Sequence, residues 1–286
     1  MRLKLIAILV GFVCLLGLPV AAQTTNTNTE QELINKYLKK TEKVQKPKKL
    51  YWITGHYGMN RINRDNDYNK FAIYENSQFT GTALSWLNTA SSFGLEFGSL
   101  VGKSFAWTVG GEYWMPLGET QTGSFAYNPP SGSTTVTELK SKIKVYGVTT
   151  NIQYYLLNAP TAKERLTKSA VWAGVGAGYY QAKWELWDQY ENLNLATSTP
   201  NPTNSTFKDN GIGFTFSVGA EYPIKSSGFA VGLDLNYLYL NFNKVSWYNS
   251  SSQEVVATYE GNSNSRVILG LSGVRGKLEL KKFFNW

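Results

Sequence analysis

The sequence predicts an all-β fold, an eight-stranded antiparallel up-and-down β-barrel that crosses a membrane, with a short helical leader before it. Three observations lead to this fold class. Two neighbouring segments repeat an inverted strand pattern, the chain begins with a secretion signal, and short and long connections alternate between the candidate strands. Together they indicate a chain that leaves the cytoplasm and folds in a lipid bilayer.

The inverted pattern occupies Ile212–Tyr222 and then Phe229–Tyr239. Every second residue is apolar or aromatic, and the residues between them are mostly Gly, Ala, Ser, Thr, Asn or a single carboxylate. A period of two means that the two faces of a strand differ. A face of small and polar residues is a poor lining for a water-soluble core. A strand that crosses a bilayer needs this arrangement, apolar outside and polar inside.

The first residues predict a secretory signal peptide over residues 1–22. Arg2 and Lys4 precede an apolar stretch, Leu5–Leu18, which is too short to span a bilayer, and small residues up to Ala22 provide a cleavage site. The single cysteine, Cys14, leaves with this signal, so we expect no disulfide or thiolate site in the mature chain. No later segment is apolar enough for a transmembrane helix. Aromatic residues make up 14% of the chain and charged residues only 17%, below the roughly 25% of soluble domains, as expected for a membrane barrel.

A basic leader is predicted over residues 23–49. It begins with a Thr/Asn-rich stretch, continues with a capping-box spacing at Thr29–Glu32 and a short helical stripe, and ends near Pro47. We interpret it as a partly helical or disordered periplasmic segment, or as a helix that docks under the barrel, on anionic lipid or on a protein partner. The formal charge of +8 falls to +6 without Arg2 and Lys4, and much of it lies in this leader. We therefore expect no nucleic-acid partner.

The barrel is predicted over residues 50–286. Eight stretches have strand character, and we expect them at about Leu50–Arg61, Ala90–Val101, Lys103–Leu117, Glu138–Leu157, Ser169–Leu186, Ile212–Tyr222, Phe229–Tyr239 and Ser263–Phe284. A ten-stranded barrel that recruits part of Phe71–Thr80 as an extra strand pair is the alternative.

The connections between these strands alternate in length. Short ones lie near Gly102, Asn158–Lys168 and Lys225–Gly228, and long polar ones cover about Ile62–Thr89, Gly118–Thr137, Trp187–Asn210 and Asn249–Asn262. Short turns on one side and long loops on the other are typical of bacterial outer-membrane barrels, with the short turns in the periplasm. Both chain ends then lie on the periplasmic side, which requires an even number of strands.

The last strand allows two registers. Val267, Leu269 and Leu271 place odd positions toward lipid, whereas Leu278 and Leu280 place even positions there. Symmetric pairing about the preceding loop puts Phe229 opposite residues near Leu280, so that Val274, Leu278 and Leu280 face lipid. We expect this late register, in one long strand whose first half extends above the membrane or carries a bulge. The competing account is a strand that ends near Val274, followed by a loose tail.

With its signal peptide, its strands of this length and an ending of Leu278-Glu-Leu-Lys-Lys-Phe-Phe-Asn-Trp286, the chain resembles the small OmpA/OmpX-type outer-membrane barrels. The terminal aromatic residue is similar to the signal by which such chains are recognised for insertion, although Trp stands where Phe is usual. The resemblance covers about Leu50–Trp286 and implies a fold and a Gram-negative-type outer-membrane location. It rests on pattern rather than on an invariant motif, so it implies no active site.

The lumen of an eight-stranded barrel is only wide enough for side chains. The predicted register sends a set of ionisable residues into it: His56, Glu96, Glu112, Glu221, Asp234, Arg275, Lys277 and Glu279. Because unpaired buried charge is costly, we expect the acids to pair with Arg275 and Lys277 or with trapped water. Our interpretation is a salt-bridged, closed core, and a proton or cation path is the alternative. Trp114, Tyr155 and Trp172 are out of phase with their lipid-facing neighbours, so they also qualify as lumen filler.

Catalysis finds little support in the sequence. His56 is the only histidine, and its phase places it inside the barrel rather than at the lipid-facing rim that a lipid-modifying His–Ser site needs. No carboxylate or histidine set has metal spacing, and the glycines of Gly174–Gly178 lack the rest of a phosphate-binding motif. We therefore predict no catalytic, cofactor-binding or metal-binding residues and no cofactor.

The function that the sequence favours is structural or interactional. We expect an outer-membrane scaffold with a closed polar lumen, in contact with outer-membrane lipids, that displays four long polar loops, because recognition tends to lie on loops held by a rigid scaffold. The alternatives are a narrow channel or transporter for small solutes and, second, a lipid-modifying enzyme.

Overall fold

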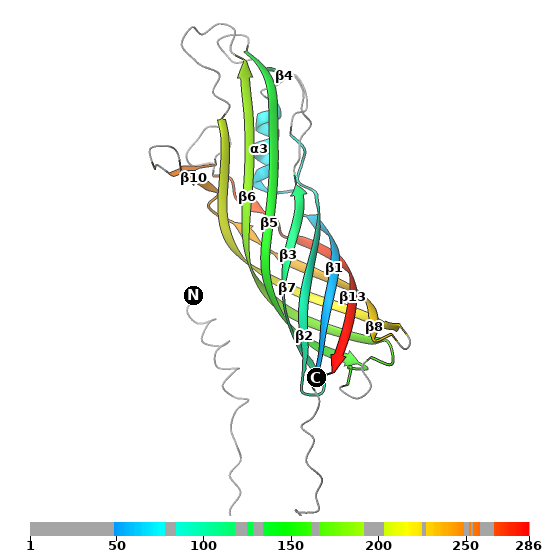
Figure 1. The fold of residues 1–286 in the computed structure, drawn as a ribbon. Coiled ribbons are helices and arrows are strands. Elements are labelled where there is room, and N and C mark those ends of the chain that lie inside the picture. The colour runs from blue at the N-terminus through cyan, green and yellow to red at the C-terminus, as the bar shows by residue number, and fades with distance from the viewer. Residues whose placement is uncertain are drawn as a thin grey trace, which may run out of the picture. The chain divides into compact units, whose positions relative to one another are not determined.

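Eight antiparallel strands close into a barrel (Figure 1), which confirms the predicted fold class. The computed structural model describes residues 49–77, 84–117, 125–127, 134–161, 166–191, 203–224, 227–248, 252, 254–257 and 266–285. The signal peptide and, apart from Lys49, the basic leader lie outside the described residues. Among the described residues, no helix is both long and apolar enough to cross a bilayer.

The barrel strands follow the predicted order. They are β1 (Leu50–Ile62), β2 (Thr89–Val101), β3 (Phe105–Leu117), β5 (Thr134–Leu157), β6 (Ala170–Glu191), β7 (Thr203–Ile224), β8 (Phe229–Tyr239) and β13 (Gly273–Asn285). Each pairs with its neighbour in sequence, apart from the short elements between them, and β1 pairs with β13 to close the ring.

The outer wall is apolar, as the alternating pattern predicted. Tyr57 of β1 lies opposite Phe93 of β2 and Leu278 of β13, and all three side chains are largely exposed. On β7 the exposed apolar or aromatic positions run from Ile212 to Ile224, thirteen residues, which is more than the 9–11 residues that a tilted strand needs to cross a bilayer. The wall is therefore built to face lipid.

The last strand adopts the late register. Phe229 lies opposite Lys282, and Val274, Leu278 and Leu280 are exposed on the outer wall. The alternative of a strand ending near Val274 with a loose tail is wrong, since β13 continues to Asn285. The predicted start at Ser263 is also wrong, because β13 begins at Gly273.

The residues before β13 have a different role from the one their odd phase suggested. Val267, Leu269 and Leu271 are buried in a hydrophobic cluster above the barrel rather than facing lipid. Short strands lie in the same upper part of the molecule: β4 (Phe125–Tyr127), β9 (Asn241–Phe242), β10 (Ser246–Tyr248), β11 (Glu254–Val256) and β12 (Leu269–Gly270). Part of the predicted connections Gly118–Thr137 and Asn249–Asn262 thus forms short strands, β4 and β11.

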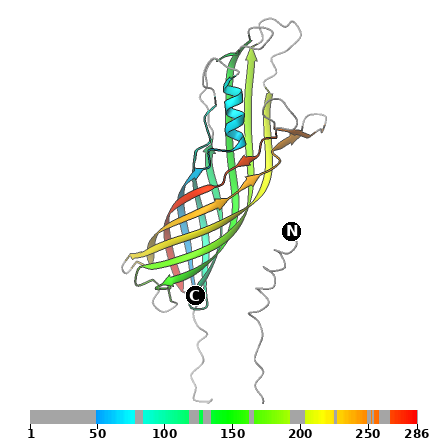
Figure 2. The same ribbon diagram turned by 180° about the vertical axis from the view of Figure 1, so that it is seen from behind.

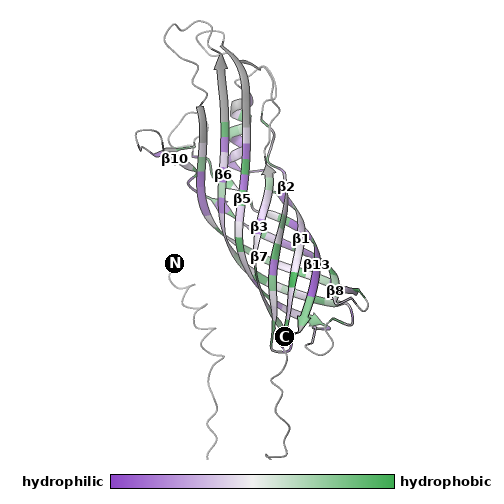
Figure 3. Cartoon of the chain, viewed as in Figure 1, coloured by the Kyte–Doolittle hydropathy of each residue, from purple (hydrophilic) through white to green (hydrophobic). Residues whose placement is uncertain are grey.

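Strands β5, β6 and β7 extend well beyond the barrel (Figures 1 and 2). The predictions for β5 and β6 already ran into these extensions, whereas the prediction for β7 began at Ile212, where the apolar-outside pattern begins. On β6 the period of two continues with its polarity reversed: Tyr180 and Trp184 are buried inside, and Lys183 and Glu185 lie outside. The same residues in the alternation still face outward, but they are now polar, so the outer face of the strand suits water instead of lipid. Figure 3 shows the hydrophilic positions on β5, β6 and β7 where these strands leave the barrel.

One helix, α3 (Asp67–Ser77), lies beside the extended strands (Figure 2). The Asn66 side chain accepts a hydrogen bond from the Asn69 backbone N–H at 2.9 Å and so caps its first turn. Tyr68, Phe71 and Ala72, at positions i, i+3 and i+4, are buried. The alternative of extra strands within Phe71–Thr80 is wrong, since this segment is helical up to Ser77.

Candidate functional site

The candidate site is the interior of the barrel, which is filled in three layers. A lower apolar layer lies at the short-turn end, a charged layer occupies the middle, and an upper apolar layer reaches into the extended strands. The structure places all eight predicted ionisable residues in the buried interior: His56, Glu96, Glu112, Glu221, Asp234, Arg275, Lys277 and Glu279.

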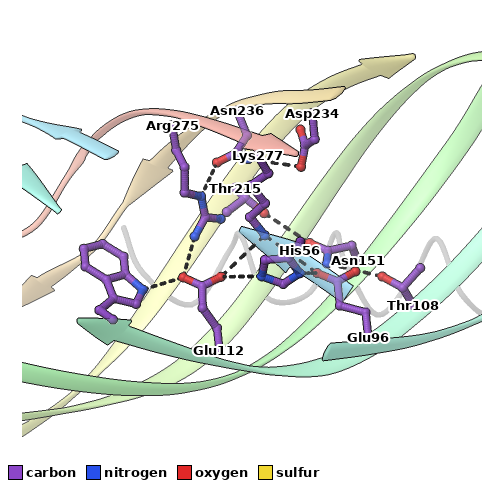
Figure 4. A network of polar contacts seen from close by, with 11 residues as sticks. His56, Glu96, Thr108, Glu112, Asn151, Thr215, Asp234, Asn236, Arg275 and Lys277 are labelled. Atoms are coloured by element: carbon purple, nitrogen blue, oxygen red, sulfur yellow. Dashed lines mark hydrogen bonds and ion pairs between the residues drawn. The ribbon is translucent and has the colours of Figure 1, made fainter. Parts of the chain in front are cut away.

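Glu112, on β3, lies at the centre of the charged layer (Figure 4). One carboxylate oxygen, Oε1, accepts a hydrogen bond from Arg275 Nη1 at 2.6 Å and a second from Trp114 Nε1. The other, Oε2, lies 3.4 Å from Lys277 Nζ and 3.8 Å from His56 Nε2. A fully buried carboxylate thus meets two cations and an imidazole, which compensates its desolvation.

Lys277 and His56 connect Glu112 to a second carboxylate, that of Glu96 on β2. Lys277 Nζ lies 3.7 Å from Glu96 Oε1, and His56 Nδ1 lies 3.7 Å from the same oxygen. The imidazole therefore stands between two carboxylates, one at each ring nitrogen. This arrangement ties β1, β2, β3 and β13 together across the lumen.

A chain of polar contacts extends from Arg275 toward β8. Arg275 Nε donates to Asn236 Oδ1 at 2.8 Å, and Asn236 Nδ2 donates to Asp234 Oδ2 at 3.1 Å. Asp234 lies directly across the sheet from Lys277, but among the described residues it makes no ion pair within 4.0 Å. A cavity of about 10 Å³ beside it, lined also by Glu96, Gln153 and Glu279, has room for about one water molecule.

Glu221 has a partner that the sequence interpretation did not include. We expected it to pair with Arg275 or Lys277, but its Oε1 lies against Lys281 Nζ and accepts a hydrogen bond from the Tyr155 hydroxyl at 3.2 Å. Lys281 is buried, and its Nζ lies 5.1 Å from the ring of Trp52. The alternation on β13 does indicate that Lys281 faces the lumen, because it continues the inward-facing series of Arg275, Lys277 and Glu279.

The lower apolar layer closes the lumen below these charges. Trp52, Tyr155, Trp172 and Phe283 are buried there, which agrees with the expectation that Tyr155 and Trp172 fill the lumen. Trp52 pairs across the sheet with Gly98, and Trp172 pairs with Gly219. A Cβ at either glycine would overlap the indole ring, so the glycines make the space that each ring occupies.

The upper apolar layer closes the other end. Trp114, Tyr180 and Trp184 are fully buried in it, and Tyr68 and Phe71 of α3 pack on Trp184 with ring centroids 5.6 and 5.0 Å apart. Tyr180 lies opposite Gly147, and its ring occupies the space that a Cβ at position 147 would need. The upper layer joins the barrel interior to the core of the extended strands.

Tyr68 and Glu185, which lie above the membrane-spanning part, carry perturbed pKa values. Burial raises the pKa of the Tyr68 phenol to about 12, although its hydroxyl donates to Ser141 Oγ at 2.9 Å. The Trp184 indole N–H donates to the same oxygen at 2.9 Å. A hydrogen bond from Lys183 lowers the pKa of the partly exposed Glu185 carboxyl.

The chemistry that this interior offers is charge pairing. His56 is buried between two carboxylates, and its accessible surface is too small for contact with a lipid or peptide substrate. Within the described part of the chain, no three His, Cys, Asp or Glu side chains are grouped so that they could hold a metal ion.

Comparison with known proteins finds similarity in structure only. No family model matches the sequence, and no curated protein matches it. Similar solved structures include the outer membrane protein OprG from Pseudomonas aeruginosa, with 12% identity and a TM-score of 0.44 over 84% of this chain and 98% of that one. A major outer membrane protein from Thermus thermophilus has 13% identity and a TM-score of 0.45, over 82% of this chain and 99% of that one.

The outer membrane protease OmpT from Escherichia coli is also similar, with 10% identity and a TM-score of 0.32, over 83% of this chain and 96% of that one. At these values none of the three proteins transfers a role. The location follows from the closed barrel with its apolar outer wall and polar lumen, because that arrangement belongs to outer-membrane barrels. This chain is a small eight-stranded β-barrel of the bacterial outer membrane.

Proposed function

We propose that this barrel is an interaction scaffold of the outer membrane, closed to solutes, that presents a structured head outside the cell. The head consists of residues 134–145 of β5, 182–191 of β6 and 203–209 of β7, together with α3 and β9–β12. It lies on the side of the long connections, which in outer-membrane barrels faces the exterior. The observation that carries the proposal is the filling of the lumen in three successive layers.

The charged layer supports closure because it connects strands that are not neighbours in the barrel wall. Arg275 of β13 reaches Glu112 of β3 past the two strands between them, and the cavity beside Asp234 has room for about one water molecule. A diffusion path for a hydrated ion would have to break these contacts and also displace Trp52 and Trp172 below them. We therefore place the narrow-channel alternative second.

The head supports the interaction role because it has a hydrophobic core, which is continuous with the upper apolar layer of the barrel. Phe71 of α3, Trp184 of β6, Phe242 of β9 and Val267 before β12 belong to one buried cluster. A folded surface outside the membrane offers a partner fixed contacts at low entropic cost, which simple solvated loops do not. Crosslinking in intact cells would identify this partner.

Planar-bilayer recording of the purified barrel tests closure. We expect no steady single-channel openings at either polarity, and liposomes with the barrel should not swell in small sugars. Steady openings in a reconstituted, heat-modifiable barrel would contradict the closed-scaffold proposal and favour the channel.

Crosslinking in intact cells, followed by purification in mild detergent and mass spectrometry, tests the interaction role. The matched control replaces residues 63–87 with Asn-Gly. Ile62 N donates to Asn88 O at 2.8 Å, so a two-residue turn joins β1 to β2 and removes α3. We expect crosslinked partners with the full chain that the control loses. Recovery of the barrel alone in both cases would refute the interaction role.

An enzymatic role is tested separately at His56, the residue that a His–Ser site would need. We expect the lipid A composition of cells carrying His56→Ala to match that of cells carrying the unaltered chain. A changed acylation pattern would make the lipid-modifying alternative the better description.

A further inference from the structure

A row of three lysines crosses the outer face of β5, β6 and β7. Lys144 lies directly opposite Lys183, and Lys183 lies directly opposite Lys208. Residues that pair directly across a sheet project from the same face, with Cβ atoms about 4.5–5.5 Å apart. Like charges in such pairs destabilise a sheet, so the row needs an explanation from outside the strand pairing.

The described neighbours neutralise this row only in part. Glu185 Oε1 lies 2.6 Å from Lys183 Nζ and 3.3 Å from Lys144 Nζ, so a single carboxylate serves two lysines. Lys208 is exposed and makes no ion pair among the described residues. Among the described side chains, the three lysines of the row therefore share the carboxylate of Glu185.

The row stands at the upper boundary of the lipid-facing wall. The last apolar row below it is Val148, Tyr179 and Ile212, and all three side chains are more than half exposed. Lys208 lies four positions before Ile212, which at about 3.3 Å per residue and a tilt of about 40° is a rise of about 10 Å. Lysine side chains also reach down toward the interface with their apolar stems along the wall. The row lies at the level of the lipid head groups.

We propose that Lys144, Lys183 and Lys208 form a binding site for the phosphate groups of an outer-leaflet lipid. The charge of the row, its like-charge pairing and its height above the apolar wall all match an anionic head group whose acyl chains lie against Val148, Tyr179 and Ile212. Strands lie about 4.8 Å apart, so the row spans about 10 Å, which is enough to contact more than one phosphate group. An acidic protein partner would meet the charges but would not need the apolar wall directly beneath them.

Native mass spectrometry of the full-length barrel, with diphosphoryl lipid A as the probe, tests this site. The variant is Lys144→Gln with Lys183→Gln and Lys208→Gln. Each lysine near a charged head group contributes about fivefold in affinity, so we expect the triple variant to bind this lipid about 100-fold more weakly. The matched control is Lys168→Gln, an exposed lysine at the short-turn end, which should leave the affinity unchanged.

Two further probes identify the source of the phosphate. Chemically dephosphorylated lipid A should bind the unaltered barrel as weakly as diphosphoryl lipid A binds the triple variant. Phosphatidylglycerol, with one phosphate, should bind at least about tenfold more weakly than diphosphoryl lipid A. Equal affinity of the triple variant and the unaltered barrel for diphosphoryl lipid A would overturn the site. Equal binding of phosphatidylglycerol would overturn the assignment to the outer leaflet.

Thermal stability separates loss of the site from loss of the fold. In detergent without lipid, the triple variant should unfold at nearly the same temperature as the unaltered chain, because the loss of the ion pairs with Glu185 offsets the removal of the like-charge pairs. Addition of diphosphoryl lipid A should raise the unfolding temperature of the unaltered chain and not that of the variant, since a ligand that binds only the folded state stabilises it. An equal rise in both proteins would contradict the proposal.

Discussion

At the scale of single residues, Glu112 shows how a charge is kept inside a membrane protein. Arg275, Lys277, His56 and Trp114 all point their polar atoms at its two oxygens. Removing a carboxylate from such a site leaves the cations buried without compensation, which costs more than the pair itself contributes. The charged layer therefore behaves as one unit.

Glu112→Gln should accordingly destabilise the barrel by about 3–5 kcal/mol. The measurement is the free energy of unfolding from urea titration of the reconstituted protein. Glu185→Gln is the matched control, since Glu185 also meets two lysines but lies outside the lumen and partly in solvent. Exposed pairs contribute about 0–1 kcal/mol, so the control should lose no more than that. Similar losses in both variants would mean that the lumen charges are not effectively desolvated.

The residues of this layer were predictable from phase alone, because one correct register of β13 sends Arg275 and Lys277 inward. Their partners were not. Glu221 meets Lys281 rather than Arg275, and Asp234 has an amide where a cation was expected. The length of each side chain and the tilt of the strands decide which charged groups meet. Neither can be predicted from the pattern of one strand at a time.

At the scale of elements, the strands of the head show where a search for one alternating pattern fails to find the strand ends. The alternation on β5, β6 and β7 continues past the membrane with apolar residues turned inward, so a search for apolar-outside strands stops too early. Helix α3 was missed for a related reason: its apolar contacts come from Tyr68, Phe71 and Ala72, a stripe of a few residues. Tertiary packing on Trp184, rather than local propensity, defines it.

Tyr68 gives the docking of α3 a pH dependence. An unfolded tyrosine titrates near pH 10, and burial raises the pKa of this one to about 12 in the folded chain. Between these values the unfolded state releases a proton that the folded state retains, which favours unfolding. The stability from the buried phenol is present below about pH 10 and is lost as the pH rises through about 12, by roughly 2–3 kcal/mol.

The comparison of the unaltered chain with Tyr68→Phe isolates this effect from the other tyrosines. At neutral pH the variant should lose about 1 kcal/mol with the hydrogen bond to Ser141. Between about pH 10 and about pH 12 its free energy of unfolding should fall less steeply than that of the unaltered chain. Parallel curves over this interval would show that the phenol is not buried as the structure has it.

At the scale of the whole molecule, the interior is filled by layers that come from parts separate in sequence and that follow one another along the barrel. The lower layer depends on Trp52 and Trp172, the charged layer on β13, and the upper layer on α3 and the extended strands. A molecule with three closures in series should stay closed when one is removed. The head would then be free to serve recognition without acting as a plug.

The variant in which Asn-Gly replaces residues 63–87 tests this division of roles. It removes Tyr68 and Phe71 from the upper layer and exposes Trp184, so the head should lose stability and the indole fluorescence should shift to the red. The barrel should still fold, because β1 and β2 keep their register, and Glu112, Arg275 and the lower aromatic layer are untouched. Single-channel recordings should therefore show no steady openings, as with the full chain at the same protein-to-lipid ratio. Openings that appear only in the variant would make α3 the plug of a channel, and the charged layer would then be the lining of a pore rather than its closure.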